Sequence, residues 1–117
     1  GLFQPDITFN GVKTHSSTPE KGKSANLNAV KFIYELEEFY NKEIKKDLNY
    51  SYEIPYTTMN IGIISGGSAV NSLSASCYST IDFRLVSEDL FNKKSKVYSD
   101  FKDLHINEIL KIADKFI

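Results

Sequence analysis

The chain has 117 residues, of which 41% are hydrophobic and 25% charged, and its formal net charge is −1. These values are typical of one soluble globular domain, and they exclude the basic surface that attracts nucleic acid or an anionic membrane. No apolar run approaches the roughly 18 residues that cross a bilayer. The single cysteine, Cys77, excludes an internal disulfide and is in keeping with the reducing cytoplasm, which is the expected location.

The N-terminal half predicts a strand, a polar loop and an amphipathic helix. Apolar and polar residues alternate in DITFNGVK (residues 6–13), which is typical of a half-buried strand. A loop at residues 14–23 contains a proline and a glycine. Ser24 is the predicted N-cap of a helix over residues 25–46. The apolar stripe of this helix comprises Ala29, Val30, Ile33, Leu36, Tyr40 and Ile44.

The C-terminal half predicts two further strands and a second helix. The segment TTMNIGIISGG (residues 57–67) alternates, and SASCYSTIDFRLV (residues 74–86) alternates most clearly. The first strand is expected to turn Met59, Ile61 and Ile63 to one face, and the second Cys77, Ser79, Ile81, Phe83 and Leu85. Residues 87–103 predict an irregular excursion, and Asp103 is a candidate cap for the final helix. The stripe of that helix comprises Ile106, Ile109, Leu110, Ala113 and Phe116.

The order strand, helix, strand, strand, helix indicates the fold class. It is that of a ferredoxin-like split βαβ sandwich, an α+β fold with one antiparallel sheet and two helices on one face. The last strand of that fold is missing, because the sequence stops at Ile117 after the second helix. We therefore expect these residues to be one domain of a larger chain.

Metal, nucleophilic and phosphate chemistry find little support in the residues. The two histidines, His15 and His105, are far apart in the sequence, and Cys77 lies within a predicted strand, so no self-contained zinc site is expected. The sequence has no G-x-S-x-G motif, and GGSAVN lacks the lysine of a phosphate-binding loop.

Three polar residues are expected near one end of the sheet. His15 follows the first strand, Asn71 lies in the loop after GGSAV, and Arg84 closes the third strand. Each also has a purely structural explanation. A loop histidine is more often solvated than functional, an asparagine after two glycines commonly serves a turn, and Arg84 can pair with Asp82 two positions away.

Two segments resemble the M20 metallopeptidase family. GVKTHSSTPEKGKSANLNAV resembles that family's G-x-x-x-H-S-S-x-P-x-x-G-x-N-A segment. YTTMNIGIISGGSAVNSLSASCYSTIDFR resembles its second signature, in which a strand reaches a G-G-x-x-x-N turn and the next strand ends in D-x-R or E-x-R. The resemblance runs from about Ile7 to Leu85. It is closest to the branch that holds acetylornithine deacetylase, succinyl-diaminopimelate desuccinylase and carboxypeptidase G2.

This resemblance implies that residues 1–117 are the dimerisation, or lid, domain of a zinc-dependent amidohydrolase acting on peptides or N-acyl amino acids. In the family, two zinc ions or similar divalent metals belong to a separate catalytic domain. The lid is therefore expected to bind no cofactor and to be inactive alone. Its expected partners are a second copy of itself, the catalytic domain of its own chain and a small substrate.

The same resemblance implies roles for five residues. His15 would reach across the dimer and donate a hydrogen bond to the oxyanion of the tetrahedral intermediate. Arg84 would bind the substrate carboxylate, and Asn71 would orient the substrate. Gly66 and Gly67 would allow the close approach of the loop that carries the asparagine.

Two alternatives remain open. A free-standing ferredoxin-like module would bind a ligand or partner without catalysis, since this fold hosts many functions. A domain that only oligomerises would keep a degenerate site, and Ser74, which replaces a proline common in the family, suits that version. Flanking H-x-D and Glu-Glu segments in the full-length sequence would favour the enzyme.

Overall fold

The computed structural model describes residues 2–46, 48, 50, 52–86, 101 and 105–117. Its elements are β1 (Leu2–Phe3), β2 (Asp6–Asn10), the 3₁₀ turn η1 (Pro19–Lys21), α1 (Ala25–Phe39), the π-helical turn η2 (Tyr40–Ile44), β3 (Thr58–Gly66), β4 (Ser76–Arg84) and α3 (Asn107–Asp114). The predicted helix over residues 25–46 is α1 continued by η2. Within the described residues no strand follows α3, and no helix is long and apolar enough to span a bilayer.

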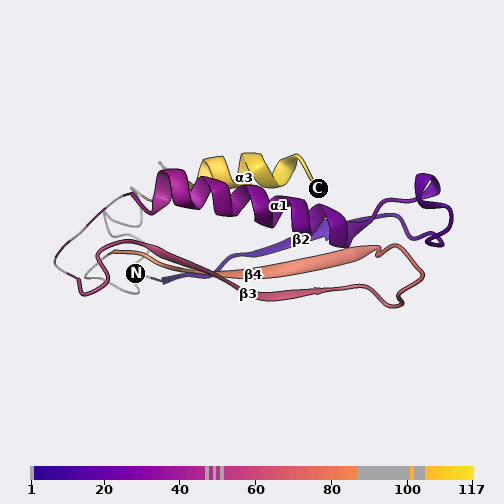
Figure 1. Cartoon of the computed structure of the whole chain (residues 1–117), viewed down its shortest axis with the longest axis horizontal. Helices are drawn as coiled ribbons and strands as arrows, with labels where there is room; N and C mark the ends of the chain where they lie inside the picture. The colour runs from indigo at the N-terminus through magenta and orange to yellow at the C-terminus, as the bar shows by residue number, and fades with distance from the viewer. Residues whose placement is uncertain (1, 47, 49, 51, 87–100, 102–104) are drawn as a thin grey trace.

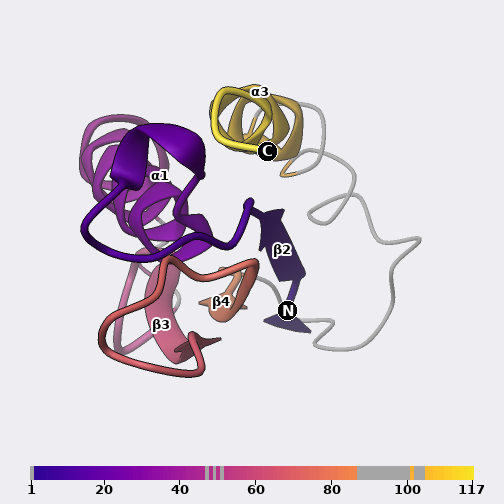
Figure 2. The ribbon, with the colours of Figure 1, turned by 90° about the vertical axis from the view of Figure 1, so that its right-hand side faces the viewer.

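The strand β4 is the centre of the antiparallel sheet. On one side it pairs with β2 near its start and with β1 near its end, and on the other side β3 pairs along its whole length. Figure 1 shows α1 and α3 covering the same face of the sheet. Figure 2 shows α1 above β3, with α3 displaced towards β2. The predicted α+β fold with two helices on one face is therefore confirmed.

The hydrophobic core lies between this sheet and the helices. Every second residue of β4 is buried, as the alternation predicts, and α1 buries a stripe with helical spacing. The residues of these two elements that form the core are Ala25, Ala29, Phe32, Leu36, Cys77, Ile81 and Phe83. Burial raises the pKa of the Cys77 thiol, so this side chain stays protonated and inert.

Three residues assigned to buried faces are exposed instead. Val30 is 56% exposed, because the buried stripe of α1 runs through Ala29, Phe32 and Leu36 and leaves Val30 outside it. Ile63 is 48% exposed, since the register with β4 shifts between Ile61 and Ile63 and breaks the alternation. Leu110 of α3 is 52% exposed. The predicted excursion over residues 87–103 lies outside the described residues, except for Phe101, which is buried. Asp103, the predicted cap of the final helix, also lies outside them.

Candidate functional site

His15 lies in a loop whose base is closed by backbone pairing. Val12 and Lys23 exchange both of their backbone hydrogen bonds, at 2.8 and 2.9 Å. Inside the loop the N–H of Thr18 donates to the carbonyl oxygen of His15 at 3.0 Å, and η1 follows directly. The loop therefore has a defined internal structure, and it holds His15 in an exposed position.

The orientation and tautomer of the His15 ring follow from contacts within the same loop. The backbone N–H of Ser17 donates to Nδ1 of His15 at 3.1 Å, and Oγ of Ser17 lies 2.8 Å from the same nitrogen. A backbone N–H is always a donor, so Nδ1 accepts and the proton of the neutral ring is on Nε2. Within the described part of the chain Nε2 has no hydrogen-bond partner. The loop thus presents an exposed N–H donor.

The loop between β3 and β4 runs beside the His15 loop. The N–H of Ser16 donates to the carbonyl oxygen of Asn71 at 2.9 Å, and His15 faces Ser72 in an isolated antiparallel bridge. The side chain of Asn71 is exposed and makes no hydrogen bond to the residues that the structure describes. The structure therefore brings His15 and Asn71 together and leaves both side chains available to a ligand.

Arg84 does not join this pair within one protomer. It is the last residue of β4 and pairs with Leu2, whereas the loop with Asn71 leads into the first residue of β4. At about 3.3 Å per residue, the nine residues of β4 separate its ends by roughly 26 Å. The expectation that His15, Asn71 and Arg84 lie at one end of the sheet is wrong for Arg84, because β4 runs away from the loop.

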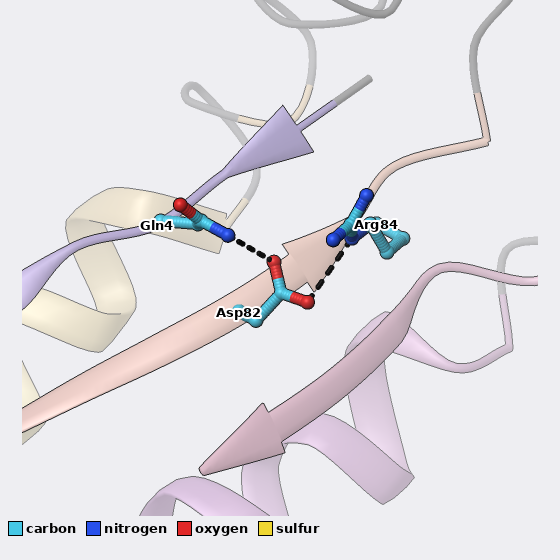
Figure 3. Close-up of polar contacts among 3 residues, drawn as sticks. All are labelled: Gln4, Asp82 and Arg84. Atoms are coloured by element: carbon cyan, nitrogen blue, oxygen red, sulfur yellow. Dashed lines mark hydrogen bonds and ion pairs between the residues drawn. The ribbon is translucent and has the colours of Figure 1, made fainter. Parts of the chain in front are cut away.

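The guanidinium of Arg84 is bound on one side by the carboxylate of Asp82, as Figure 3 shows. Its Nε donates to Oδ2 of Asp82 at 3.0 Å, which confirms the pairing that the sequence predicts. The other carboxylate oxygen of Asp82 accepts a hydrogen bond from Nε2 of Gln4 at 3.0 Å. The Arg84 side chain is 61% exposed, and its terminal amino groups contact no acceptor among the described residues. Two parallel donors of this kind match a carboxylate.

Gly66 is the last residue of β3 and Gly67 follows it, at the point where Nδ2 of Asn26 donates to the carbonyl oxygen of Gly66. A Cβ atom on Gly66 would run into Oδ1 of Asn26 and would lie 2.7 Å from Cβ of Cys77. Gly67 has a φ of 101°, a left-handed conformation that favours glycine. Both glycines shape the entry to the loop, and their contact with substrate stays a prediction.

The residues that the structure describes do not form a metal site. Among them no group of three or more His, Cys, Asp and Glu side chains is placed to hold a metal ion. His105 is buried, and its ring packs edge-on against Phe39 and Phe101.

The fold and the site define a small α+β domain with exposed polar side chains on two adjacent loops. It has an open sheet, two helices on one face and two paired loops that carry an exposed imidazole and an exposed amide. Residues 1–106 match the peptidase dimerisation domain of the M20 family. The chain belongs to that family.

Known relatives agree with this assignment. The chain is 32% identical over 84 residues to acetylornithine deacetylase from Myxococcus xanthus, an alignment that covers 72% of this chain and 22% of that enzyme. A tripeptidase from Staphylococcus aureus has 25% identity and a TM-score of 0.58, covering 98% of this chain and 26% of its own. An amidase of the hydantoinase/carbamoylase family from Burkholderia multivorans shares the fold, with a TM-score of 0.60, 17% identity and coverage of 98% and 25%. The chain is thus a dimerisation domain of the kind found in M20 hydrolases and spans about a quarter or less of their length.

Proposed function

We propose that residues 1–117 are the dimerisation and lid domain of a metal-dependent amidohydrolase that removes the acyl group from N-acyl amino acids. The observation that carries this proposal is the exposed Nε2–H donor of His15, held beside Asn71 by paired loops. The similarity to acetylornithine deacetylase supports the substrate class. The metal ions, two zinc ions in this proposal, belong to a separate catalytic domain, and the lid alone catalyses nothing. A single buried thiol, Cys77, is in keeping with a cytoplasmic enzyme.

His15 contributes by stabilising charge that develops on the substrate. When water adds to an amide carbonyl, its oxygen becomes an oxyanion, and a preorganised N–H donor stabilises that transition state by about 3–4 kcal/mol. Because Nδ1 accepts from the backbone of Ser17, the ring keeps its proton on Nε2 without having to be charged. Asn71 lies alongside and orients the acyl group or the amide.

The separation of His15 from Arg84 leads to a site built from two protomers. A small substrate does not span the roughly 26 Å between the two ends of β4. In a two-fold dimer joined antiparallel along β3, the loop end of one protomer lies beside the Arg84 end of the other. His15 and Asn71 of one copy then share a substrate with Arg84 of its partner, whose guanidinium binds the carboxylate.

The surface proposed for this dimer is the free edge of β3 together with the exposed side of α1. Within the described residues β3 pairs only with β4, so its other edge is open. Leu27, Val30 and Tyr34 are 51%, 56% and 65% exposed at helical spacing, and Ile64 of β3 is 55% exposed. Figure 2 shows α1 and β3 on the same side of the molecule, so one partner covers both.

Charged substitutions on this surface should separate the protomers. In the full-length protein, Val30→Asp combined with Ile64→Asp places like charges where the proposed interface is apolar, and it should weaken dimerisation by about 100-fold or more. Light scattering after size-exclusion chromatography measures the mass. Leu110→Asp, at a similarly exposed position on α3, is the matched control and should remain dimeric. A dimeric double variant would contradict the proposed interface.

Replacing Arg84 tests the substrate class. Arg84→Ala in the full-length enzyme should raise KM for an N-acetyl amino acid by about 30- to 100-fold, since one charge-assisted bidentate contact contributes about 2–3 kcal/mol. The carboxamide of the same substrate lacks the charge, so its KM should change little. Lys111→Ala, which breaks an exposed ion pair with Glu108 on α3, is the control. The proposed function is wrong if the wild type hydrolyses neither compound, and the role of Arg84 is wrong if both lose equally.

A further inference from the structure

Both ends of the loop that carries Asn71 are tied to the first turn of α1. At the start of the loop, Nδ2 of Asn26 donates to the carbonyl oxygen of Gly66 at 3.2 Å. At its end, Ser74 is only 5% exposed, and its Oγ accepts the backbone N–H of Asn26 at 2.7 Å. The carbonyl oxygen of Ser74 accepts the N–H of Ala25 at 3.0 Å. Two consecutive helix residues thus hold both ends of one loop.

Close packing at two glycines restricts this arrangement further. A Cβ atom on Gly66 would run into Oδ1 of Asn26. A Cβ atom on Gly11 would run into the carbonyl oxygens of Ser74 and Lys23. The helix start, the end of β3 and the return of the loop therefore approach closely at these two glycines. Loss of the Asn26 or Ser74 side chain removes a hydrogen bond that ties one end of the loop to the helix.

We propose that Asn26 and Ser74 are positioning residues that fix Asn71 beside His15. This inference rests on the proposed function of the two loops. Asn71 reaches the His15 loop through its own carbonyl oxygen, which accepts from Ser16, so a displacement of the loop ends changes the distance between imidazole and amide. Neither Asn26 nor Ser74 touches the substrate. Each acts through Asn71, by setting where its side chain lies.

The test compares two serines that cap the same helix in the full-length enzyme. Oγ of Ser24 accepts the N–H of Leu27 at 3.1 Å, so Ser24→Ala and Ser74→Ala each remove one capping hydrogen bond. Both should lower the unfolding temperature by about 2–4 °C. Only Ser74→Ala also frees the loop, and it should lower kcat for an N-acetyl amino acid by about 10- to 100-fold. Ser24→Ala should keep kcat within about 2-fold of the wild type.

A second matched pair lies on the same turn of α1. Asn26→Ala should lower kcat about as much as Ser74→Ala, because it releases the other end of the loop. Asn28→Ala is its control and should leave kcat unchanged, since Nδ2 of Asn28 has no hydrogen-bond partner among the described residues. Equal losses in Ser24→Ala and Ser74→Ala, or in Asn28→Ala and Asn26→Ala, would overturn the inference.

A double-mutant cycle separates positioning from a loss of stability. If Ser74 acts through Asn71, Ser74→Ala should have almost no further effect on kcat once Asn71→Ala is present. The same loss in both backgrounds would overturn the inference and leave the proposed function intact. If Asn71→Ala by itself leaves hydrolysis unchanged, the proposed role of the loop and the inference both fail.

Discussion

Replacing His15 by alanine in the full-length enzyme should lower kcat for N-acyl amino acid hydrolysis by about 100- to 1000-fold. The lost N–H donor acts on charge that is present only in the transition state, so KM should change little. His15 is exposed, and its ring contacts only Ser17 within the loop, whereas the base of the loop is closed by backbone hydrogen bonds between Val12 and Lys23. The unfolding temperature should therefore remain close to that of the wild type. Steady-state kinetics and a thermal melt measure these quantities.

The variant His15→Gln provides the comparison for that result. Its side-chain amide keeps an N–H donor at nearly the distance of Nε2, although without the support that Ser17 gives to the ring. It should recover part of the lost turnover. A His15→Ala enzyme with wild-type kcat would make His15 an ordinary loop residue and would leave the proposed oxyanion role without support.

Mixing the His15→Ala and Arg84→Ala variants should restore activity when the substrate concentration is far below the KM of Arg84→Ala. Full-length His15→Ala and Arg84→Ala proteins are each defective at both sites of their own dimers. After the subunits exchange, a mixed dimer carries one site with both defects and one site with neither, provided that His15 and Arg84 come from different protomers. When equal amounts exchange fully, half of the dimers are mixed, and one of the two sites in each mixed dimer is intact. The mixture should therefore reach about a quarter of the wild-type rate.

A site built from a single protomer predicts a different rate for the mixture. If one protomer supplied both His15 and Arg84 to its site, every site in a mixed dimer would keep one defect, and mixing would restore nothing. Two populations of His15→Ala protein, mixed in the same way, are the control for the mixing procedure and should stay defective. The experiment therefore tests the geometric argument that the two ends of β4 serve different sites.

The elements with strong local patterns could be predicted from the sequence. The alternation in β4 predicted which residues are buried, because one face of that strand lies on the core. Ser24 predicted the start of α1, because its hydroxyl accepts a backbone N–H of the first turn. β1 was not predicted, since two residues carry no period. The exposure of Ile63 was not predicted either, because the register shift that causes it depends on pairing with β4.

For the site, the sequence predicted that His15 and Asn71 lie near the same end of the sheet. The direction of β4, and with it the position of Arg84, was misjudged. A strand that begins at the Asn71 loop must end at the far side of the sheet, which was enough to place Arg84 there. The contacts of Asn26 and Ser74 join segments almost fifty positions apart, so no local pattern indicates them. Ser74 replaces a proline of the family pattern, and its buried hydrogen bonds give the loop a fixed end by other means.

The central position of β4 also has a consequence during synthesis on the ribosome. The other strands that the structure describes pair with β4, which is the last of them to be made. Ribosomes add roughly 5–20 residues per second, so about 4 to 15 seconds pass between the end of β2 and the end of β4. Only the helix α1 can form from local contacts in that interval. The nascent chain therefore lacks the central strand that completes the core around Phe9 and the apolar face of α1 until β4 emerges, and chaperones have their opportunity to bind then.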